Sequence, residues 1–328
     1  MKAVVYKRYG PPDVLQLAEV EKPAPKDTEV LIKIYAATVN RTDCGFLRAA
    51  PFIVRFFSGL MKPKNAILGS EFAGQIEAVG KGVTSLGVGD RVFGFNGVTF
   101  GAHAEYMVMP EEAPVATMPE HLTYEEAAPS LEGSHYALAD IRAADVRKGQ
   151  RVLIYGATGA IGSAAVQIAK HIGANVTAVC GTKNVELVKS LGADKVVDYE
   201  KEDFTKDDQT YDAVFDAVGK RSFAECRPLL KPCGIYLSTD LGYLAQNPFL
   251  ALTTPLFGKK KVLFPIPTLT KRDVIFIKEL IEGGSFKPVI DRCYPLEEVA
   301  DAFRYVETGQ KIGNVVIAVA HAVHQRGR

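Results

Sequence analysis

The sequence of 328 residues lacks an excess of either charge and lacks any long apolar run. Lys and Arg total 39 and Asp and Glu total 38, so the formal net charge is only +1. This balance removes the global electrostatic argument for binding nucleic acid or an anionic membrane surface. No stretch of about 18 apolar residues occurs, and polar residues soon follow the first apolar run, so we expect neither a membrane span nor a signal peptide.

Cysteine is scarce, and its spacing offers no disulfide or metal framework. The five cysteines form no CxxC pair and lie at Cys44, Cys180, Cys226, Cys233 and Cys293. An odd, scattered set fits neither a disulfide-rich secreted domain nor a zinc ribbon. We therefore expect a reducing, cytoplasmic location.

The composition that is present, 47% apolar and 23% charged residues, is close to that of an average globular protein. The length predicts roughly two domains. From residue 1 to about residue 118, short β-branched runs at 3–6, 30–36, 74–79 and 91–95 are separated by Gly and Pro clusters. This texture indicates an antiparallel or barrel-like β domain.

The texture changes between residues 119 and 264. Continuous apolar runs are separated by helical stretches and lie at 151–155, 175–180, 195–198, 211–216, 234–238 and 261–264. Strands buried on both faces are typical of a parallel sheet covered by helices, so a doubly wound Rossmann domain is predicted for 119–264. A helix at 272–282 and a strand at 314–320 follow, and we expect segment 265–328 to rejoin the β-rich domain of residues 1–118. The predicted fold class is α/β.

Three glycines directly after the first buried strand carry the signature of a dinucleotide site. Gly156, Gly159 and Gly162 follow residues 151–155 and open a helical run to residue 172. In this spacing the first glycine permits a tight turn, the second lets backbone N–H groups approach a pyrophosphate, and the third lets the helix pack on the strand. The alternative is a tight turn without a ligand.

The end of the next strand discriminates between NAD and NADP. An NAD enzyme usually carries Asp or Glu there to hold the ribose 2′-hydroxyl. This chain instead carries a cation and small donors at Cys180, Gly181, Thr182, Lys183 and Asn184, with no acid before Glu186. A 2′-phosphate suits this set, so NADPH is predicted as the cofactor. The alternative for Lys183 is an ordinary solvated lysine at the start of a helix.

Several segments together resemble the medium-chain dehydrogenase/reductase superfamily, and most of all its zinc-independent quinone oxidoreductase branch. They include VNRTDC at 39–44, GSEFAGQIEAVG at 69–80, GATGAIGSAAVQIAK at 156–170 and YPLEEVADAFRYVETGQKIGNVVI at 294–317. The resemblance implies a GroES-like catalytic domain, a Rossmann domain and an active site in the cleft of such an enzyme.

The positions that hold zinc in zinc-bearing relatives differ here. The resemblance places Asn40 where those relatives have Cys, and Ser70 where they have the His of a GHE segment, so a thiolate and an imidazole are both missing. The remaining histidines show no ligand spacing and lie at His103, His121, His135, His171, His321 and His324. We expect His103 to be packed or solvated, and we expect no metal.

Nucleotide contacts are carried over from the family by position. They fall on Asn40, Ser134, Thr158, Gly159, Ala160, Ile161, Gly181, Lys183, Tyr199, Val218 and Asn314. The glycine loop and the strand end described above add Gly156, Gly162 and Thr182 to the predicted cofactor site. Asn314 departs from the family, which often has Lys there. Many family members have a Tyr near Gly45 or Phe46, and its absence here leaves the proton donor open.

Two residues are predicted as catalytic because the cleft lacks a metal and a loop tyrosine. Asn40 would donate a hydrogen bond to the substrate oxygen or to the nicotinamide ribose, and Arg48 is a second, charged candidate. The alternative is that Asn40 only turns the backbone of its loop. Cys44 is not expected to act as a nucleophile, because hydride transfer needs none.

Two apolar blocks are predicted to line the substrate pocket. Their representatives are Phe52, Phe56, Phe57, Tyr243 and Phe249. Ordinary packing or a dimer contact is the alternative for each block. The run from 249 to 264 could also place an edge strand at a homodimer interface.

The predicted function is NADPH-dependent hydride transfer to a quinone or an α,β-unsaturated carbonyl, with a small apolar acceptor and no zinc. The alternatives are a zinc-independent alcohol or aldehyde reductase and an NADPH-binding regulatory protein with little turnover. The sequence does not name the acceptor.

Overall fold

The structure, a computed structural model, describes residues 1–319 as two compact units. Unit 1 comprises residues 1–132, 269–282 and 288–319, and unit 2 comprises residues 133–268 and 283–287. Among the described residues, no helix combines the length and the apolar character needed to cross a bilayer.

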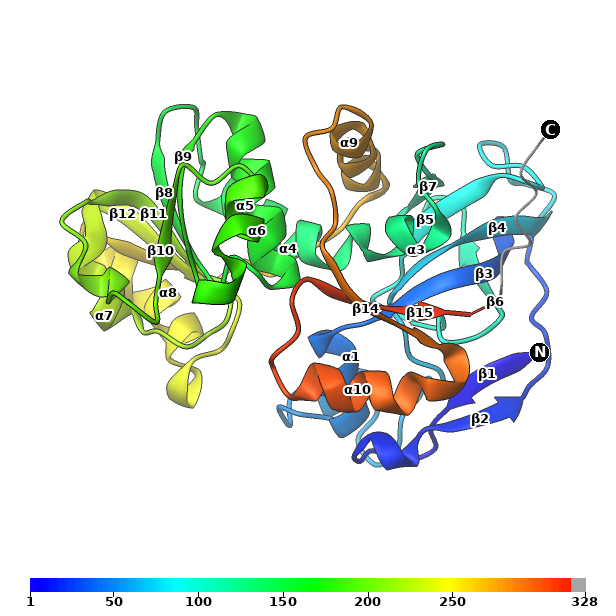
Figure 1. Ribbon diagram of the computed structural model, residues 1–328. Coiled ribbons are helices and arrows are strands. Elements are labelled where there is room, and N and C mark those ends of the chain that lie inside the picture. The colour runs from blue at the N-terminus through cyan, green and yellow to red at the C-terminus, as the bar shows by residue number, and fades with distance from the viewer. Residues whose placement is uncertain (320–328) are drawn as a thin grey trace. The chain divides into compact units, whose positions relative to one another are not determined.

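Unit 2 is built on a parallel sheet of six strands (Figure 1). The strands are β8 (Arg151–Tyr155), β9 (Asn175–Cys180), β10 (Lys195–Asp198), β11 (Tyr211–Asp216), β12 (Leu230–Ser238) and β13 (Lys261–Leu263). Their order is β10-β9-β8-β11-β12-β13, and every pair is parallel. This is the strand order 3-2-1-4-5-6 of a dinucleotide-binding Rossmann sheet, so the predicted doubly wound architecture is confirmed.

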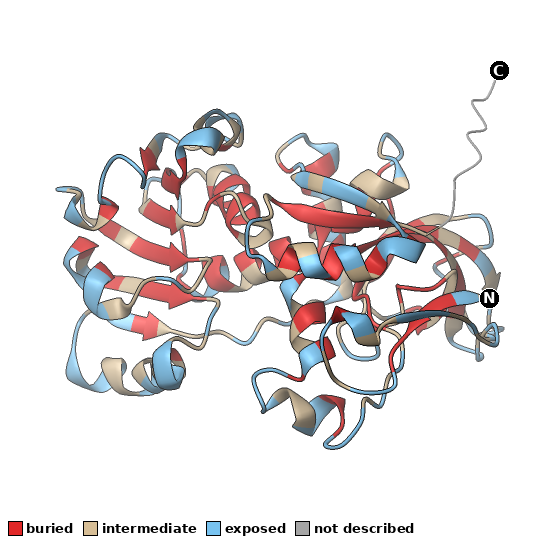
Figure 2. Cartoon of the chain, turned by 60° about the horizontal axis from the view of Figure 1, so that its bottom comes forward, coloured by how far each residue is buried: buried red, intermediate tan, exposed pale blue. Residues whose placement is uncertain are grey.

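The first helix of unit 2 precedes β8, and the helices that follow connect the strands. In chain order the helices are α4 (Glu132–Ala143), α5 (Ala160–Ile172), α6 (Val185–Ser190), α7 (Phe223–Cys226) and α8 (Gln246–Phe257). Val152, Leu153 and Ile154 of β8 are fully buried, as the continuous apolar run predicts. Figure 2 shows the central strands mostly in the red of buried residues.

Unit 1 carries a mainly antiparallel sheet, with strand order β14-β15-β3-β4-β5-β7 and with β6 also paired to β3. A separate hairpin joins β1 (Lys2–Val5) and β2 (Gln16–Glu19). The other strands are β3 (Glu29–Val39), β4 (Glu71–Val79), β5 (Arg91–Phe95), β6 (Tyr106–Pro110), β7 (Val115–Thr117), β14 (Ile290–Pro295) and β15 (Asn314–Ala318). β15 pairs with β3, so the late segment joins the β-rich unit.

The helices of unit 1 are α1 (Arg41–Arg48), α2 (Val54–Ser58), α3 (Tyr124–Ala127), α9 (Lys271–Glu282) and α10 (Val299–Glu307). The core of unit 1 includes the fully buried side chains of Ile32, Phe72 and Phe303.

The division of the chain differs from the predicted boundary at residue 119. Residues 119–132 belong to unit 1, because the carboxylate of Glu71 on β4 accepts the backbone N–H groups of Leu131 and Glu132, each at 2.6 Å. Segment 283–287 belongs to unit 2, where Gln167 of α5 bonds to the backbone of Lys287. Periodicity carries no information about either side-chain contact.

Candidate functional site

The loop between β8 and α5 has the geometry that a pyrophosphate needs. Gly156 adopts a φ of +84°, a conformation that L side chains rarely take. A Cβ at Gly162 would lie 2.1 Å from the carbonyl oxygen of Gly156, so only glycine lets the helix approach the strand. A Cβ at Gly159 would meet nothing closer than 3.6 Å, so the backbone there is open to a ligand.

The first turn of α5 provides the donors for that ligand. Gly159 is the N-cap of α5, and glycine has no side-chain oxygen that could cap the helix. The first N–H group bonded within the helix is that of Ser163, which donates to Gly159 O at 2.8 Å. The amides of Ala160, Ile161 and Gly162 therefore have no partner in the helix ladder and lie at its positive end. These residues fit the pyrophosphate of a dinucleotide, which would be bound by backbone N–H groups.

The ends of β9 and β10 form the region that would meet the adenosine ribose. Lys183, on the 3₁₀ turn Thr182–Asn184, is exposed, and no ion pair of its ammonium occurs among residues 1–319. Two acids also lie here: Thr182 Oγ1 donates to Asp198 at 2.7 Å and to Glu200 at 3.1 Å. A Cβ at Gly181 would lie 2.7 Å from Glu200 Oε1.

Sequence reasoning missed the acid Glu200, because the usual position of the ribose-binding carboxylate is the end of β9. The signal was the position of Asp198 and Glu200 at the end of β10, since β10 pairs in parallel with β9 and carboxyl ends of parallel strands meet at one edge. The thiol of Cys180 is buried, and burial raises its pKa to about 11.

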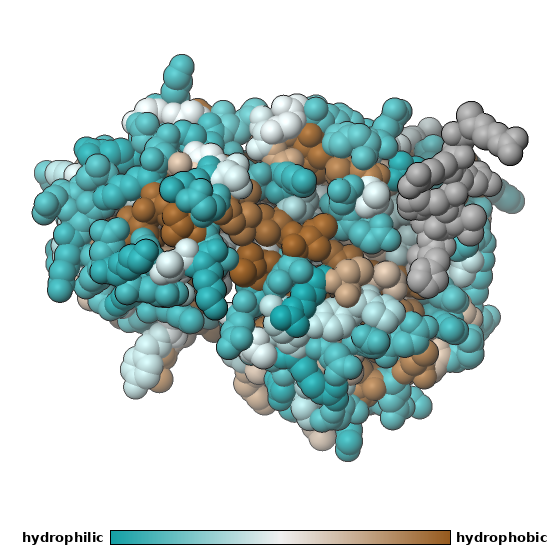
Figure 3. Space-filling view, in the orientation of Figure 1, coloured by the Kyte–Doolittle hydropathy of each residue, from teal (hydrophilic) through white to brown (hydrophobic). Residues whose placement is uncertain are grey.

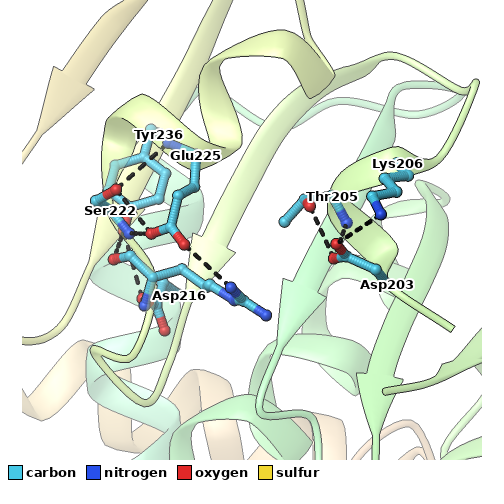
Figure 4. A network of polar contacts seen from close by, with 8 residues as sticks. Asp203, Thr205, Lys206, Asp216, Ser222, Glu225 and Tyr236 are labelled. Carbon is cyan, nitrogen blue, oxygen red and sulfur yellow. Dashed lines mark hydrogen bonds and ion pairs between the residues drawn. The ribbon is translucent and has the colours of Figure 1, made fainter. Parts of the chain in front are cut away.

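Asp216, the last residue of β11, holds the loop that carries Val218. Its carboxylate accepts the N–H groups of Val218 at 3.1 Å, Gly219 at 2.8 Å and Arg221 at 2.9 Å. Burial raises the pKa of this carboxyl, and the bonded amides oppose that rise. Figure 4 shows Asp216 beside the Ser222–Glu225 capping pair and Tyr236. Val218 packs over Gly156, since a Cβ at Gly156 would lie 2.5 Å from Val218 Cγ1.

The other predicted nucleotide residues lie in different settings. Ser134 is buried on α4 in unit 2, and Tyr199 is half exposed after β10. Asn314 begins β15 in unit 1, where its Nδ2 donates to Val289 O at 3.0 Å. Whether these residues contact a nucleotide remains a prediction.

In unit 1, Asn40 has two partners within the protein and is 5% exposed. Its Oδ1 accepts the N–H of Asp43 at 2.9 Å, and its own N–H donates to Asp43 Oδ2 at 3.0 Å. These two bonds form a capping box at the start of α1. Its Nδ2 donates to Ser70 Oγ at 3.0 Å. One amide hydrogen of Asn40 therefore remains for another acceptor.

Asn40 and Ser70 do not fit a catalytic zinc ion. Zn²⁺ prefers thiolate, imidazole and carboxylate ligands, whereas this pair offers an amide and a hydroxyl that bond to each other. Within residues 1–319, no group of three or more His, Cys, Asp and Glu side chains is arranged to hold a metal. His321 and His324 lie outside the described residues.

His103 is packed rather than solvated. It is fully buried, its Nε2 donates to Thr38 O at 2.8 Å, and its ring lies edge-on to Phe303. Burial lowers its pKa to about 4, so the ring is neutral near pH 7. Cys44 is also buried, and burial raises the pKa of its thiol, which agrees with its having no nucleophilic role.

A cluster of buried acids behind the Asn40–Ser70 pair was missed by sequence reasoning. Burial raises the pKa of Asp43 and of Glu71 to about 7 and that of Glu132 to about 8. Burial also lowers the pKa of Lys311 to about 8, while Glu132 and Glu71 oppose this shift. No local spacing signals the cluster, because its members come from α1, β4, the start of α4 and the loop before β15.

Arg48, the second predicted catalytic residue, is neutralised by an ion pair. Its Nε and Nη2 both donate to the carboxylate of Glu307 on α10, with Nη2 at 2.7 Å from Oε2. Its side chain is partly exposed and lines a shallow cavity with Arg41 and Cys44. A free positive charge at Arg48 is therefore not available without opening that pair.

The predicted pocket residues separate into a cavity and an exposed face. Phe56 and Phe57 line a cavity of about 510 Å³ in unit 1, together with Tyr6, Phe46 and Phe100. Phe52 lies outside this lining and contacts Phe56 edge-on, with ring centroids 6.0 Å apart. In unit 2, Tyr243 lies just before α8 and is 79% exposed, and Phe249 lies on α8 and is 64% exposed. Figure 3 shows pale and brown side chains on the projection where Figure 1 places α8.

Known protein families match segments of both units. Residues 26–120 match the family described as alcohol dehydrogenase GroES-like domain, and residues 191–317 match the family described as zinc-binding dehydrogenase. The chain is 34% identical to the 2-methylene-furan-3-one reductase of Solanum lycopersicum, over 97% of this chain and 79% of that protein. It is 32% identical to the chloroplastic NADPH-dependent alkenal/one oxidoreductase of Arabidopsis thaliana, over the same shares.

Among solved structures, the quinone oxidoreductase from Coxiella burnetii is similar, with a TM-score of 0.87 and 26% identity, over 98% of this chain and 99% of that one. The fold and these matches define a pyridine-nucleotide dehydrogenase of the medium-chain dehydrogenase/reductase superfamily. Within that superfamily, the chain belongs to the quinone oxidoreductase branch.

Proposed function

We propose that this chain is an NADPH-dependent oxidoreductase that transfers a hydride to a quinone or an α,β-unsaturated carbonyl without zinc. The observation that carries the proposal is the geometry of the loop Gly156–Gly162. A ligand can approach the backbone at Gly159, where a Cβ would meet nothing closer than 3.6 Å, whereas at Gly162 a Cβ would lie 2.1 Å from Gly156 O. Relatives named for alkenal/one, quinone and trans-enoyl reduction support the acceptor class.

NADPH, when bound, supplies the hydride. The chain's own residues bind and orient it: the first-turn amides of α5 hold the pyrophosphate, and Lys183 pairs with the 2′-phosphate. The Asp216-bound loop keeps Val218 against Gly156. A Cβ at Gly181 would lie 2.7 Å from Glu200 Oε1, so we expect the Glu200 carboxylate to weaken the preference for NADPH without removing it.

Asn40 is proposed as the neutral donor to the acceptor oxygen or the nicotinamide ribose, through the amide hydrogen that Ser70 does not take. A conjugated acceptor needs less polarisation than a simple ketone, so an amide donor suffices where a zinc-dependent enzyme would use a Lewis acid. The amide–hydroxyl pair Asn40–Ser70 supports zinc independence. The aromatic cavity of unit 1 supports a small apolar acceptor.

Steady-state oxidation of NADPH with a quinone, an enone and an aldehyde of similar size tests the proposal. We expect turnover with the first two, a preference for NADPH over NADH, and no loss of activity after treatment with a chelator. Turnover with the aldehyde alone would identify an alcohol or aldehyde reductase. Tight NADPH binding without turnover would identify a regulatory binder.

We also propose a homodimer and a reducing, cytoplasmic compartment. β13 is an edge strand, because no other strand among residues 1–319 pairs with its second side. Exposed apolar side chains on the neighbouring α8 support burial in an interface. All five cysteines are free thiols, which supports a reducing environment. Light scattering of the purified chain measures the oligomeric state.

A further inference from the structure

Two adjoining cavities in unit 1 differ in character. The first, of about 510 Å³, is lined by aromatic rings that include Phe46, Phe57 and Phe100. The second, of about 620 Å³, is lined by Lys7, Lys62 and Lys64 together with apolar side chains. Tyr6 and Lys64 line both, so the two cavities share a wall.

The lysines of the second cavity have no acidic partners in the part of the chain that the structure describes. Neither cavity is lined by Asp or Glu, and the ammonium groups of Lys7, Lys62 and Lys64 make no ion pair within residues 1–319. The sequence from 44 to 70 contains Arg48, Arg55 and two of these lysines but no acidic residue. Arg48, by contrast, is paired with Glu307.

Backbone contacts hold the three lysines on neighbouring segments. Tyr6 N–H donates to Ala66 O at 2.9 Å, and Lys64 N–H donates to Ser58 O at 2.8 Å. Tyr9 fixes the same loop by bonding Gly59 O at 2.6 Å. The fold therefore keeps like charges along one concave surface, where an anion would relieve their repulsion.

We propose that the physiological acceptor is an amphiphile, with an apolar conjugated part in the aromatic cavity and an anionic carboxylate or phosphate group bound by Lys7, Lys62 and Lys64. This inference rests on the proposed function and specifies its substrate class. The concave lining favours a small molecule, since both volumes lie in the range of about 300–1,000 Å³ that such ligands occupy. The exposed Phe52 and Met61 make binding of the loop to an anionic bilayer the competing outcome.

The test uses three acceptors with one enone head and tails of equal length, which end in a neutral amide, a carboxylate or a phosphate. We expect kcat/KM for one or both anionic acceptors to exceed that of the neutral one by about 10- to 100-fold, mostly through KM. Rising salt should reduce this ratio. The carboxylate and phosphate arms show which anion is preferred.

The double variant Lys62→Gln/Lys64→Gln should lower the ratio of anionic to neutral kcat/KM by about 10-fold, whereas Lys81→Gln, a solvated lysine of unit 1, should leave the ratio unchanged. Calorimetric binding of the saturated forms of the three acceptors repeats the comparison without hydride transfer. Lack of turnover combined with selective binding of the anionic forms would refute the proposed function and keep the part of this inference that assigns an anion-binding site to the lysines.

Two results would overturn the inference. One is equal kcat/KM and equal affinity for the neutral and anionic forms. The other is lysine-dependent sedimentation with vesicles of phosphatidylserine and phosphatidylcholine when the soluble acceptors show no preference, because the lysines would then serve a membrane surface. Circular dichroism of the double variant confirms that its fold is intact.

Discussion

The proposed nucleotide loop of unit 2 and the Asn40 region of unit 1 would act through different parts of the chain. The loop offers backbone: a turn at Gly156, an open surface at Gly159 and a close contact at Gly162. The Asn40 region acts through side chains, in which Asn40, Ser70 and Asp43 complete one another's hydrogen bonds. A site made of backbone groups depends on glycines at particular positions of the sequence. A site made of side chains depends on which hydrogen-bonding residues the fold brings together.

The largest effect is expected at Asn40, where one side chain has a capping role and a proposed catalytic role. Asn40→Ser keeps an oxygen for the N–H of Asp43 and removes the amide donor. Single-turnover oxidation of NADPH by a quinone should slow by about 10- to 1,000-fold, the range for loss of one preorganised donor. An unchanged rate with an unchanged melting temperature would show that Asn40 only caps helix α1 and has no catalytic role.

The next effect concerns the choice of nucleotide. Lys183→Glu should weaken NADPH binding by about 10- to 100-fold and reduce or reverse the preference over NADH, since a charge-assisted contact is replaced by repulsion. Glu200→Gln should shift the preference in the opposite direction by a smaller factor. Titration calorimetry measures both. Lys148→Glu, an exposed site elsewhere in unit 2, is the matched control, and an equal loss there would show a nonspecific charge effect.

Glycine substitutions separate packing from ligand access in the loop. Gly162→Ala should lower the free energy of unfolding by about 1–3 kcal/mol, because its Cβ would collide with the Gly156 carbonyl. Gly159→Ala should retain stability and weaken NADPH binding, because its Cβ enters the open side. Gly87→Ala, whose Cβ would meet nothing closer than 3.8 Å, is the control for denaturant unfolding. Full NADPH affinity in Gly159→Ala would contradict the assigned role of that backbone.

The smallest effect is a change in pH dependence at Glu71. The pKa of Glu71 is 4.5 in the unfolded reference and about 7 in the folded protein, so the folded state binds more protons between these values. Its contribution makes stability fall as pH rises from about 4.5 to 7, by roughly 1–3 kcal/mol. Glu71→Gln should flatten this decline, and Asp43 and Glu132 should preserve part of it. Melting temperatures at pH 5 and pH 8 measure the slope, and Glu112→Gln, an exposed acid, should leave it unchanged.

The same contrast explains what the sequence could predict. Strands at 91–95, 151–155, 175–180, 195–198 and 211–216 match β5, β8, β9, β10 and β11 in both bounds, because buried apolar runs end at polar or glycine residues. The phosphate loop follows from spacing within seven residues. These are local patterns, which sequence reasoning can follow.

Long-range partners could not be predicted in this way. The contact of Thr182 with Glu200 depends on two strands meeting edge to edge, and the ion pair of Arg48 with Glu307 joins two helices far apart in sequence. Placement of residues 119–132 depends on the buried carboxylate of Glu71, which from the sequence alone resembles any other acid. Whether Asn40 also contacts the substrate stays a prediction.

The pairing of β15 with β3 has a consequence for how the protein forms on the ribosome. Val315 lies opposite Val39, and the chain between them contains all of unit 2. Unit 2 can therefore complete its sheet while synthesis continues, whereas the sheet of unit 1 keeps one side of β3 partly open until β15 emerges. During that interval β3 has unpaired backbone groups, so we expect a chain that ends before residue 314 to keep an open strand edge that favours aggregation.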